Sequence, residues 1–251
     1  MHNIRERALK RELLKGTFLS LGSSMIAEMA GLAGFDWLLL DLEHAPGDTF
    51  SLIGQMQAVN RLPTASVVRI PNLDKTAVKR ILDLGAAGIM VPNLDNVKDV
   101  KDMVSFMRYH PGGVRGLGTS TRAASYGFNH PNYMNTANDR LLTVIQIENQ
   151  GAVDNCEAFA AIDGVDVLFV GPMDLGVMLG MPKRFDDPAF VAVLQRVADA
   201  AKANGKSTGI LVADPKLVPV VKQMGYNFVA LSSDTNLLVK SFKEVVATLN
   251  S

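Results

Sequence analysis

The chain has 251 residues, of which 48% are hydrophobic and 20% are charged, and 25 basic residues balance 25 acidic ones. This composition is that of an ordinary globular protein, and the balanced charge gives no overall field that would attract nucleic acid or an anionic membrane. A single cysteine, Cys156, excludes an internal disulfide and a multi-cysteine metal site. No stretch approaches the roughly 20 apolar residues of a membrane span, and the charged start is not a secretory signal. We therefore expect a cytoplasmic protein.

Short β-rich runs alternate with longer segments of helical periodicity along the whole chain. The expected strands are residues 17–21, 37–42, 66–70, 88–91, 141–148, 165–170, 207–212 and 228–231. The expected helices are residues 24–33, 49–59, 75–84, 97–108, 151–162, 188–204, 215–224 and 236–249. Gly34, Gly85, Gly205 and Gly225 each stand just before a strand, where a glycine cap ends a helix.

Eight such β–α units in about 250 residues match the (β/α)8 barrel. We therefore predict an α/β protein of the TIM-barrel type, with residues 1–251 forming one domain. A doubly wound sheet is the alternative, but residues 20–24 after the first strand carry one glycine instead of the Gly-x-Gly-x-x-Gly fingerprint. No nucleotide cofactor is expected.

Residues 109–140 interrupt this alternation between the fourth helix and the fifth strand. About 30 residues is far longer than the usual connection of about 4–6, so the segment either contains short helices or has a function. Because it leads from a helix to a strand, it should begin at the barrel end opposite the active site, in a position to contact another subunit. A surface excursion without a function is the alternative.

Ionisable residues gather where several expected strands end. The apolar run 35–40 leads into Asp41, Glu43 and His44, and two later strands lead into Glu148 and Asp174. A buried strand has no structural need for such groups, because desolvating an unpaired charge is costly. The carboxyl ends of barrel strands converge on one face, which is where active sites of such barrels lie. The pattern therefore predicts an active site.

Glu148 and Asp174 are the predicted metal ligands. Two carboxylates from neighbouring strands supply hard oxygens suited to Mg²⁺ or Mn²⁺, and they leave positions open for substrate and water. Without a cation the two carboxylates would repel each other, and one would be driven toward protonation.

Three further groups complete the predicted site. Arg69 ends the third strand, where a guanidinium is suited to hold a carboxylate or to stabilise an oxyanion; a structural bridge to Asp41 or Glu43 is the alternative. His44 is the candidate acid–base group, and Asp41, three residues earlier, is placed to orient its ring. The turn that begins at Gly171 allows close backbone approach, and its amides are suited to a substrate carboxylate.

These motifs together resemble those of the HpcH/HpaI aldolase family, the metal-dependent (class II) pyruvate aldolases of the 4-hydroxy-2-oxoheptanedioate and 2-dehydro-3-deoxy-sugar-acid types. The resemblance runs from about residue 15 to the end of the chain. The motifs that carry it are GFDWLLLDLEHAP at 34–46, VR at 68–69, the segment 109–118, QIE at 146–148 and GPMDL at 171–175. It implies a barrel of the phosphoenolpyruvate/pyruvate type, usually a hexamer built as a trimer of dimers, whose last helix is exchanged between subunits.

The resemblance also implies a carbon–carbon lyase that reversibly cleaves a 4-hydroxy-2-oxo acid to pyruvate, or a close 2-oxo acid, and an aldehyde through a metal-bound enolate. Glu148 and Asp174 would hold Mg²⁺, Mn²⁺ or Co²⁺. Arg69 would steady the enolate oxygen, while His44, set by Asp41, would move protons through water. No Schiff-base lysine is needed. The residues expected to bind substrate are Arg69, Gln146, Gly171, Pro172, Met173 and Val212, with Glu43 supporting them.

Two rival functions are weighed against this one. A citrate-lyase-β-like enzyme acting on acyl-CoA thioesters would share the acidic ligands and the arginine, but the Asp-Leu-Glu-His motif and the lack of an evident basic groove for the CoA diphosphate argue against it. A barrel that had lost catalysis would lack one of the catalytic groups, and all of them are present. The aldehyde stays open: it is succinic semialdehyde, a sugar-derived hydroxyaldehyde such as lactaldehyde or tartronate semialdehyde, or another aldehyde.

Overall fold

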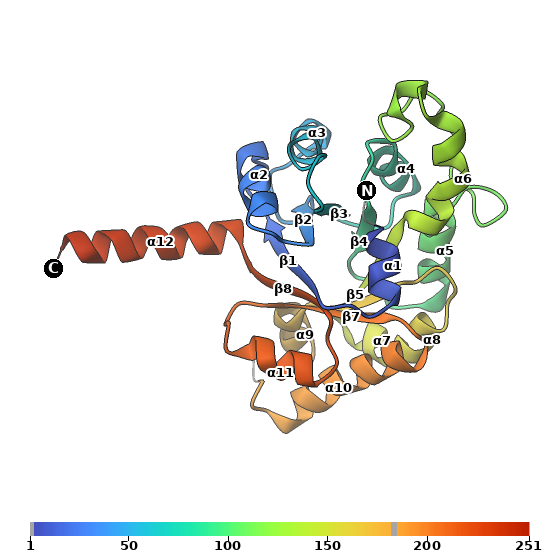
Figure 1. The fold of residues 1–251 in the computed structure, drawn as a ribbon. Helices are drawn as coiled ribbons and strands as arrows, with labels where there is room; N and C mark the ends of the chain where they lie inside the picture. Colours follow the sequence, from blue (N-terminus) through green and yellow to red (C-terminus); the bar gives the residue numbers. More distant parts are fainter. Residues whose placement is uncertain (1–2, 182–184, 251) are drawn as a thin grey trace.

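A closed barrel of parallel strands, surrounded by helices, forms the body of the molecule (Figure 1). The computed structural model describes residues 3–181 and 185–250. The strands are β1 (Leu14–Leu19), β2 (Trp37–Asp41), β3 (Ala65–Arg69), β4 (Gly88–Val91), β5 (Leu142–Ile147), β6 (Val167–Val170), β7 (Ser207–Val212) and β8 (Phe228–Ser233). Each strand pairs in parallel with its neighbours in sequence, and β8 pairs with β1 to close the ring. The predicted (β/α)8 barrel is confirmed.

The eight expected helices are found, one of them divided in two, and three further helices, α1, α6 and α9, lie outside the expected ranges. They are α1 (Ile4–Leu9), α2 (Ser24–Leu32), α3 (Thr49–Ala58), α4 (Lys75–Asp83), α5 (Val97–Met107), α6 (His130–Arg140), α7 (Gln150–Asp154), α8 (Cys156–Ala160), α9 (Pro172–Met178), α10 (Pro188–Ala203), α11 (Leu217–Gln223) and α12 (Asp234–Leu249). Residues 151–162 form α7 and α8, which meet at Asn155 with non-helical dihedrals. The four glycines expected to end helices all have positive φ, between 67° and 97°.

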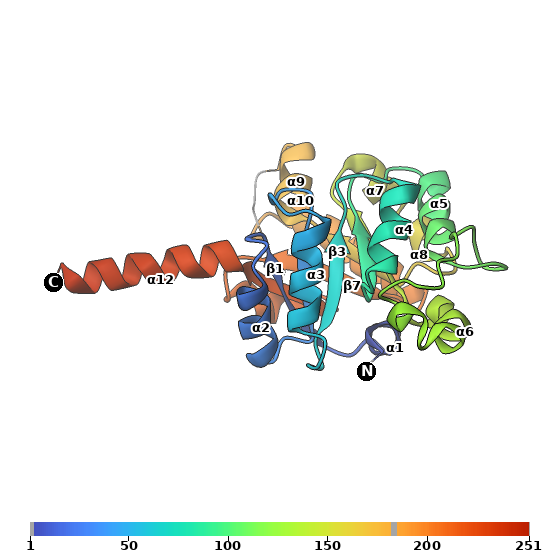
Figure 2. The ribbon, with the colours of Figure 1, turned by 90° about the horizontal axis from the view of Figure 1, so that it is seen from above.

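The long segment 109–140 contains two helical elements, the 3-10 turn η1 (Ser125–Gly127) and α6. It follows α5 and returns to the amino end of β5, and its helix α6 packs against α1 (Figure 1 and Figure 2). Arg115 fixes its first part, because the guanidinium lies 4.5 Å from the ring centre of Tyr109 and 2.8 Å from a carboxylate oxygen of Asp83. The expectation that this segment hides short helices is confirmed.

Two apolar layers result from the alternation of side chains along each strand. Trp37 and Leu39 face the barrel interior, whereas Leu38 and Leu40 face the surrounding helices. Trp37 stacks on Phe228 with ring centres 4.1 Å apart. A Cβ on the neighbouring Gly16 would lie 2.1 Å from the Trp37 ring, so only glycine leaves room for the indole. Phe169 meets both of these rings edge-on, so three aromatic side chains pack together across the lower barrel.

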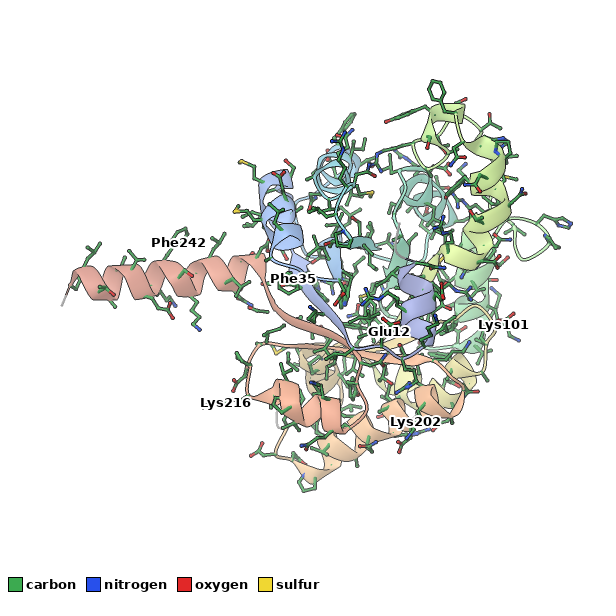
Figure 3. The ribbon with its side chains drawn as sticks, in the orientation of Figure 1. Glu12, Phe35, Lys101, Lys202, Lys216 and Phe242 are labelled. Atoms are coloured by element: carbon green, nitrogen blue, oxygen red, sulfur yellow. The ribbon has the colours of Figure 1, made fainter. Side chains whose placement is uncertain are left out.

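The last helix, α12, extends away from the barrel in both views (Figure 1 and Figure 2). It contacts β1 and β8 where it begins, and Asp234, its first residue, accepts hydrogen bonds from the backbone amides of Ser20 (2.9 Å) and Leu21 (3.0 Å). Phe242 lies far along the helix with no other element beside it (Figure 3) and is 65% exposed. This helix thus carries an apolar surface that its own barrel leaves uncovered.

None of the helices in the two described stretches combines the length and the apolar character needed to cross a membrane.

Candidate functional site

The inward-facing positions change from apolar to polar at the carboxyl ends of three strands. In β2 the inward residues Trp37 and Leu39 are followed by Asp41. The inward face of β3 ends in Arg69, and that of β5 continues into Glu148, the residue directly after the strand. Side chains two residues apart share a face of the strand, so the same alternation that fills the lower barrel brings these charged groups to its upper mouth. The predicted gathering of charges at this end is what the structure shows.

Arg69 is fixed by two carboxylates. Asp41 lies opposite it in the strand register, and the two form a bidentate pair with Nε–Oδ1 and NH2–Oδ2 distances of 2.9 and 2.7 Å. Glu43 lies 3.0 Å from the third guanidinium nitrogen, and the ring of Phe18 lies beneath it, 5.4 Å away. Burial tends to raise the pKa of Asp41, but hydrogen bonds and charge from Arg69 outweigh burial and hold that pKa below its ordinary value. The structural bridge considered for Arg69 is present, and it orients the guanidinium.

The ring of His44 lies beside Glu43 and not beside Asp41. Its Nε2 is 3.7 Å from the Glu43 carboxylate, and the side chain is 67% exposed. Asp41 is instead occupied by Arg69 and by the backbone amide of Glu43, at 3.0 Å. The expected pairing of Asp41 with the His44 ring is therefore not found, because Asp41 points across the sheet while His44 lies in the turn beyond the strand. Burial raises the pKa of Glu43, opposed by the charges of Arg69 and His44.

Glu148 is a buried carboxylate at the end of β5. One oxygen accepts a hydrogen bond from the backbone amide of Asn93 at 2.9 Å, and the other contacts the side-chain amide of Gln146. Burial raises the pKa of Glu148 to about 7. The nearby charges of Glu43 and Asp174 also raise this pKa, whereas the hydrogen bond from the Asn93 amide lowers it. A carboxylate in this environment gains from a cation beside it.

Asn93 is a member of the site that the sequence interpretation missed. It follows β4 with a positive φ of 58°, which turns its amide toward Glu148. The sequence feature that could have indicated Asn93 is the Pro92-Asn93 pair directly after a strand. Asparagine adopts left-handed backbone more readily than most residues do, so a sharp turn was to be expected there.

Gly171 lets the end of β6 approach the side chains of Gln146 and Glu148. A Cβ at this position would lie 3.1 Å from the Gln146 amide nitrogen and 3.2 Å from Glu148. Pro172 begins α9, Met173 is 47% exposed, and the amides at the start of a helix have no partner within it. Substrate binding by Gly171, Pro172 and Met173 remains a prediction.

Asp174, in the first turn of α9, is exposed at the same mouth. It is close enough for its charge to raise the pKa values of both Glu148 and Glu43. Within residues 3–181 and 185–250, no three His, Cys, Asp or Glu side chains are arranged to hold a metal ion. A cation at this mouth would therefore rest on the Glu148 and Asp174 pair, with its other positions left to water and substrate.

The donor set at this mouth suits a hard divalent cation. Its two carboxylates offer oxygen atoms, and one of them, Glu148, is buried with a raised pKa. Oε1 of Gln146 is also buried and has no hydrogen-bond partner in the described parts of the chain. A buried acceptor without a donor is costly, and a water or hydroxyl group bound in the site would satisfy it. The residues present thus fit the predicted metal.

The prediction for Val212 is wrong. Its side chain is 1% exposed and packs in the outer apolar layer between the barrel and the helices. Leu211, one residue earlier, packs against the inner layer. A shift of one residue moves a strand side chain to the opposite face, so Leu211 faces the barrel interior at this end of β7.

Comparison with known proteins gives concordant results. The family model described as HpcH/HpaI aldolase/citrate lyase matches residues 14–241. A hydroxypyruvate/pyruvate aldolase of Pseudomonas aeruginosa is 37% identical over 98% of this chain and 91% of its own length. A 5-keto-4-deoxy-D-glucarate aldolase of Enterobacter sp. is 38% identical over 93% and 94%. The crystal structure of an HpcH/HpaI aldolase/citrate lyase family protein from Burkholderia cenocepacia superposes with a TM-score of 0.94, at 34% identity and full coverage of both chains.

Citrate lyases are more distant in both sequence and structure. One from Burkholderia xenovorans superposes with a TM-score of 0.61 at 18% identity, covering 89% of this chain and 74% of that one. This likeness shows a shared fold alone.

Proposed function

Because this chain belongs to the HpcH/HpaI aldolase/citrate lyase family, we propose that it cleaves a 4-hydroxy-2-oxo acid reversibly to pyruvate and an aldehyde with the help of a divalent cation. Four curated relatives, 36% to 38% identical, are aldolases, so the chain is a carbon–carbon lyase. The observation that carries the proposal is the buried Glu148 carboxylate, with its pKa raised to about 7, at the same mouth as an arginine held by two acids.

Glu148 and Asp174 are the residues that would hold the cation, whether Mg²⁺, Mn²⁺ or Co²⁺. When bound, such a cation supplies Lewis-acid charge that stabilises negative charge on a 2-oxo acid. Glu148 is already oriented for this role by the Asn93 amide, so binding does not have to order the side chain first.

Arg69 stabilises the negative charge that develops on the enolate oxygen of pyruvate. Its guanidinium is held by Asp41 and Glu43 and is only 6% exposed, so its donors are oriented before the substrate arrives. Donors fixed in a site with little water stabilise developing charge more than donors that must reorganise. The two acids thus act through Arg69 by fixing its position.

His44 takes the proton from the substrate hydroxyl, through a water molecule, as the carbon–carbon bond breaks. Its ring is exposed at the rim of the mouth, where water reaches it. We expect His44→Ala to slow aldol cleavage by roughly 10²–10⁴-fold, the usual contribution of a positioned acid–base group. The matched control is His110→Ala in the exposed part of the 109–140 segment, which should keep the wild-type rate. A near-normal rate for His44→Ala at every pH would contradict this role.

The proposed function is tested by hydrogen exchange at the pyruvate methyl group, which requires enolisation but no aldehyde. NMR in D2O would follow the loss of the methyl proton signal, first with EDTA and then with Mg²⁺, Mn²⁺ or Co²⁺. We expect exchange that depends on the metal. If no metal supports exchange, the pyruvate proposal fails, and protection from thermal unfolding by an acyl-CoA would then favour the citrate-lyase type of activity.

We also propose that the chain assembles into a hexamer in which α12 is exchanged between subunits. Along the projecting helix, Phe242, Val246 and Leu249 are 65%, 56% and 81% exposed. The helix α2 likewise exposes Met25 (71%) and Leu32 (69%) on its own barrel. Large exposed apolar surfaces of this kind mark interaction sites, and a second copy carries both of the surfaces that need covering.

Phe242→Asp should break this assembly into smaller species, because it places a charge in the contact that α12 would make. Size-exclusion chromatography with light scattering measures the change in mass. Lys240→Asp is the matched control, since it lies two residues away on the other face of the same helix. Equal masses for the wild type and both variants would contradict the exchange.

A further inference from the structure

The turn that follows β4 is held against the chain segment that carries Glu148. Residues 93–95 lie between β4 and α5, and residues 148–155 run from the end of β5 through α7. Strands β4 and β5 pair in parallel, so both connections leave the barrel side by side at its carboxyl end. Glu148, Gly151 and Asn155 each contact the turn. These three contacts form a clamp on residues 93–95.

The first two contacts are hydrogen bonds that hold the two ends of the turn. The Glu148 carboxylate accepts from the backbone amide of Asn93 at 2.9 Å. At the other end, the side-chain amide of Asn155 donates to the backbone carbonyl of Asp95 at 3.0 Å and to that of Gly151 at 2.9 Å. Asn155 stands between α7 and α8, and it thus ties the turn to the end of α7.

The third contact is a close approach that only glycine permits. A Cβ on Gly151 would lie 2.8 Å from the Cβ of Asp95 and 3.2 Å from its carbonyl oxygen, whereas carbon atoms in contact are normally about 3.5–4.0 Å apart. Gly151 lies within α7, where alanine would be the better helix former. A side chain at this position would push the turn away from α7.

The conformation of the turn determines where the Asn93 amide points. Asn93 has a φ of 58°, in the left-handed region, and its side chain is exposed, as is that of Asp95. Of the three turn residues only Leu94 is buried, at 4% exposure, in the outer apolar layer. The ends of the turn are therefore held by the clamp and not by burial of their own side chains.

We propose that Gly151 and Asn155 are positioning residues for Glu148: by fixing the turn 93–95, they hold the Asn93 amide against the carboxylate and so strengthen the binding of a divalent cation. Both act through the turn, because their contacts are with Asp95. The use of this orientation rests on the proposed function, whereas the clamp itself is measurable without metal or substrate.

The clamp is tested by hydrogen–deuterium exchange of the full chain in EDTA, read by mass spectrometry on peptides that cover residues 92–96. Asn155→Ala should speed exchange in these peptides by roughly 2- to 10-fold, the worth of one hydrogen bond. Asn204→Ala is the matched control. Asn204 donates to the carbonyl of Ala200 at 2.9 Å, the same local bond that Asn155 makes to Gly151, at the end of α10. It should leave exchange at 92–96 unchanged.

The effect on the cation is tested by Mn²⁺ titration without substrate, above the Glu148 pKa of about 7, with free Mn²⁺ read by its paramagnetic resonance. Groups that orient a metal ligand typically contribute 10- to 100-fold to metal affinity. We expect Asn155→Ala and Gly151→Ala to weaken Mn²⁺ binding by roughly tenfold, and Asn204→Ala to bind like the wild type. A merely structural effect of Gly151→Ala would favour α7 and leave Mn²⁺ affinity unchanged.

Two variants of Asn93 test the route through the backbone. Asn93→Gly should stay near the wild-type Mn²⁺ affinity, because glycine adopts the left-handed conformation freely. Asn93→Val should weaken binding as Asn155→Ala does, because a β-branched residue is an outlier at positive φ.

Three results would overturn the proposal. They are unchanged exchange at 92–96 in Asn155→Ala, faster exchange with unchanged Mn²⁺ affinity, and equal Mn²⁺ affinity in Asn93→Gly and Asn93→Val. A wild type that binds Mn²⁺ but does not exchange the pyruvate methyl protons would contradict the proposed function and leave the clamp standing. A wild type that binds no Mn²⁺ would overturn both.

Discussion

Glu148→Gln should reduce metal-dependent exchange of the pyruvate methyl protons by roughly 10³-fold, the scale of a lost electrostatic stabilisation of several kcal/mol. The substitution keeps the size of the side chain but removes the buried charge that the Asn93 amide orients. NMR exchange rates at saturating Mg²⁺ measure the effect. Glu157→Gln, at a surface carboxylate paired with Arg196, is the matched control, and it should keep the wild-type rate because exposed ion pairs contribute little.

The same variant gives a prediction about pH. A metal ligand must be deprotonated, and the pKa of Glu148 is raised to about 7 by burial. The affinity of the wild type for Mn²⁺ should therefore fall below pH 7 by up to about tenfold per pH unit, and Glu148→Gln should bind weakly without this dependence. Titrations at several pH values, read by the paramagnetic resonance of free Mn²⁺, measure it. Wild-type affinity that stays constant from pH 8 to pH 5.5 would contradict the role of Glu148.

The raised pKa also sets how the stability of the metal-free protein depends on pH. The folded state binds the Glu148 proton more tightly than the unfolded state does, so this group stabilises the fold most below its ordinary pKa near 4.5. That contribution is lost as the pH rises through about 7. Added Mg²⁺ should restore stability above pH 7, which thermal unfolding with and without EDTA would measure.

Arg69→Ala should slow pyruvate proton exchange by roughly 10²–10⁴-fold and should also destabilise the fold by about 3–5 kcal/mol, as breaking a buried ion pair does. Both effects have the same origin. In the proposed reaction Arg69 would stabilise charge on the substrate, and in the fold it balances the buried Asp41 carboxylate at 2.7 Å. Exchange rates and denaturant unfolding of the same preparation would measure the two effects together.

The pH dependence of unfolding identifies the pair responsible. Arg69 lowers the pKa of Asp41, so the pair contributes stability above the ordinary aspartate pKa of about 3.9 and loses it as the pH falls further. The difference in stability between the wild type and Arg69→Ala should therefore shrink in acid. Arg69→Lys keeps the charge without the planar fork, and it should recover more stability than activity. Full activity in Arg69→Lys would contradict the need for a bidentate arginine.

The sequence predicted the barrel because each β–α unit carries its own local signals. Apolar runs, helical periodicity and the glycines at helix ends are visible within a few residues, and β4 and β7 were predicted to the residue. The gathering of charged side chains at the mouth was predictable for the same reason, since charges that interrupt apolar runs mark strand ends. The sequence did not predict helix α6 as a defined helix, because its segment has too few apolar residues for a clear helical period. The segment reads His-Pro-Asn-Tyr-Met-Asn-Thr-Ala-Asn-Asp-Arg.

What the sequence did not predict depends on contacts between distant segments. Asp41 pairs with Arg69 because the register of β2 against β3 places them opposite each other, while local spacing favoured His44. Val212 was misplaced because a fully apolar strand end gives no sign of which face points inward.

The aromatic filling of the lower barrel has a consequence for the order of events in catalysis. With Trp37 and Phe228 stacked across the interior, we expect both substrates of the proposed reaction to use one entrance and neither product to leave through the far side. Arg69 and Glu148 are buried in that entrance, whereas His44 is exposed at its rim. In the direction of bond formation of the proposed reaction, we therefore expect pyruvate to enter first and the aldehyde to bind over it. In cleavage the aldehyde departs first, so pyruvate should inhibit as the last product to leave, competitively with the cleaved substrate.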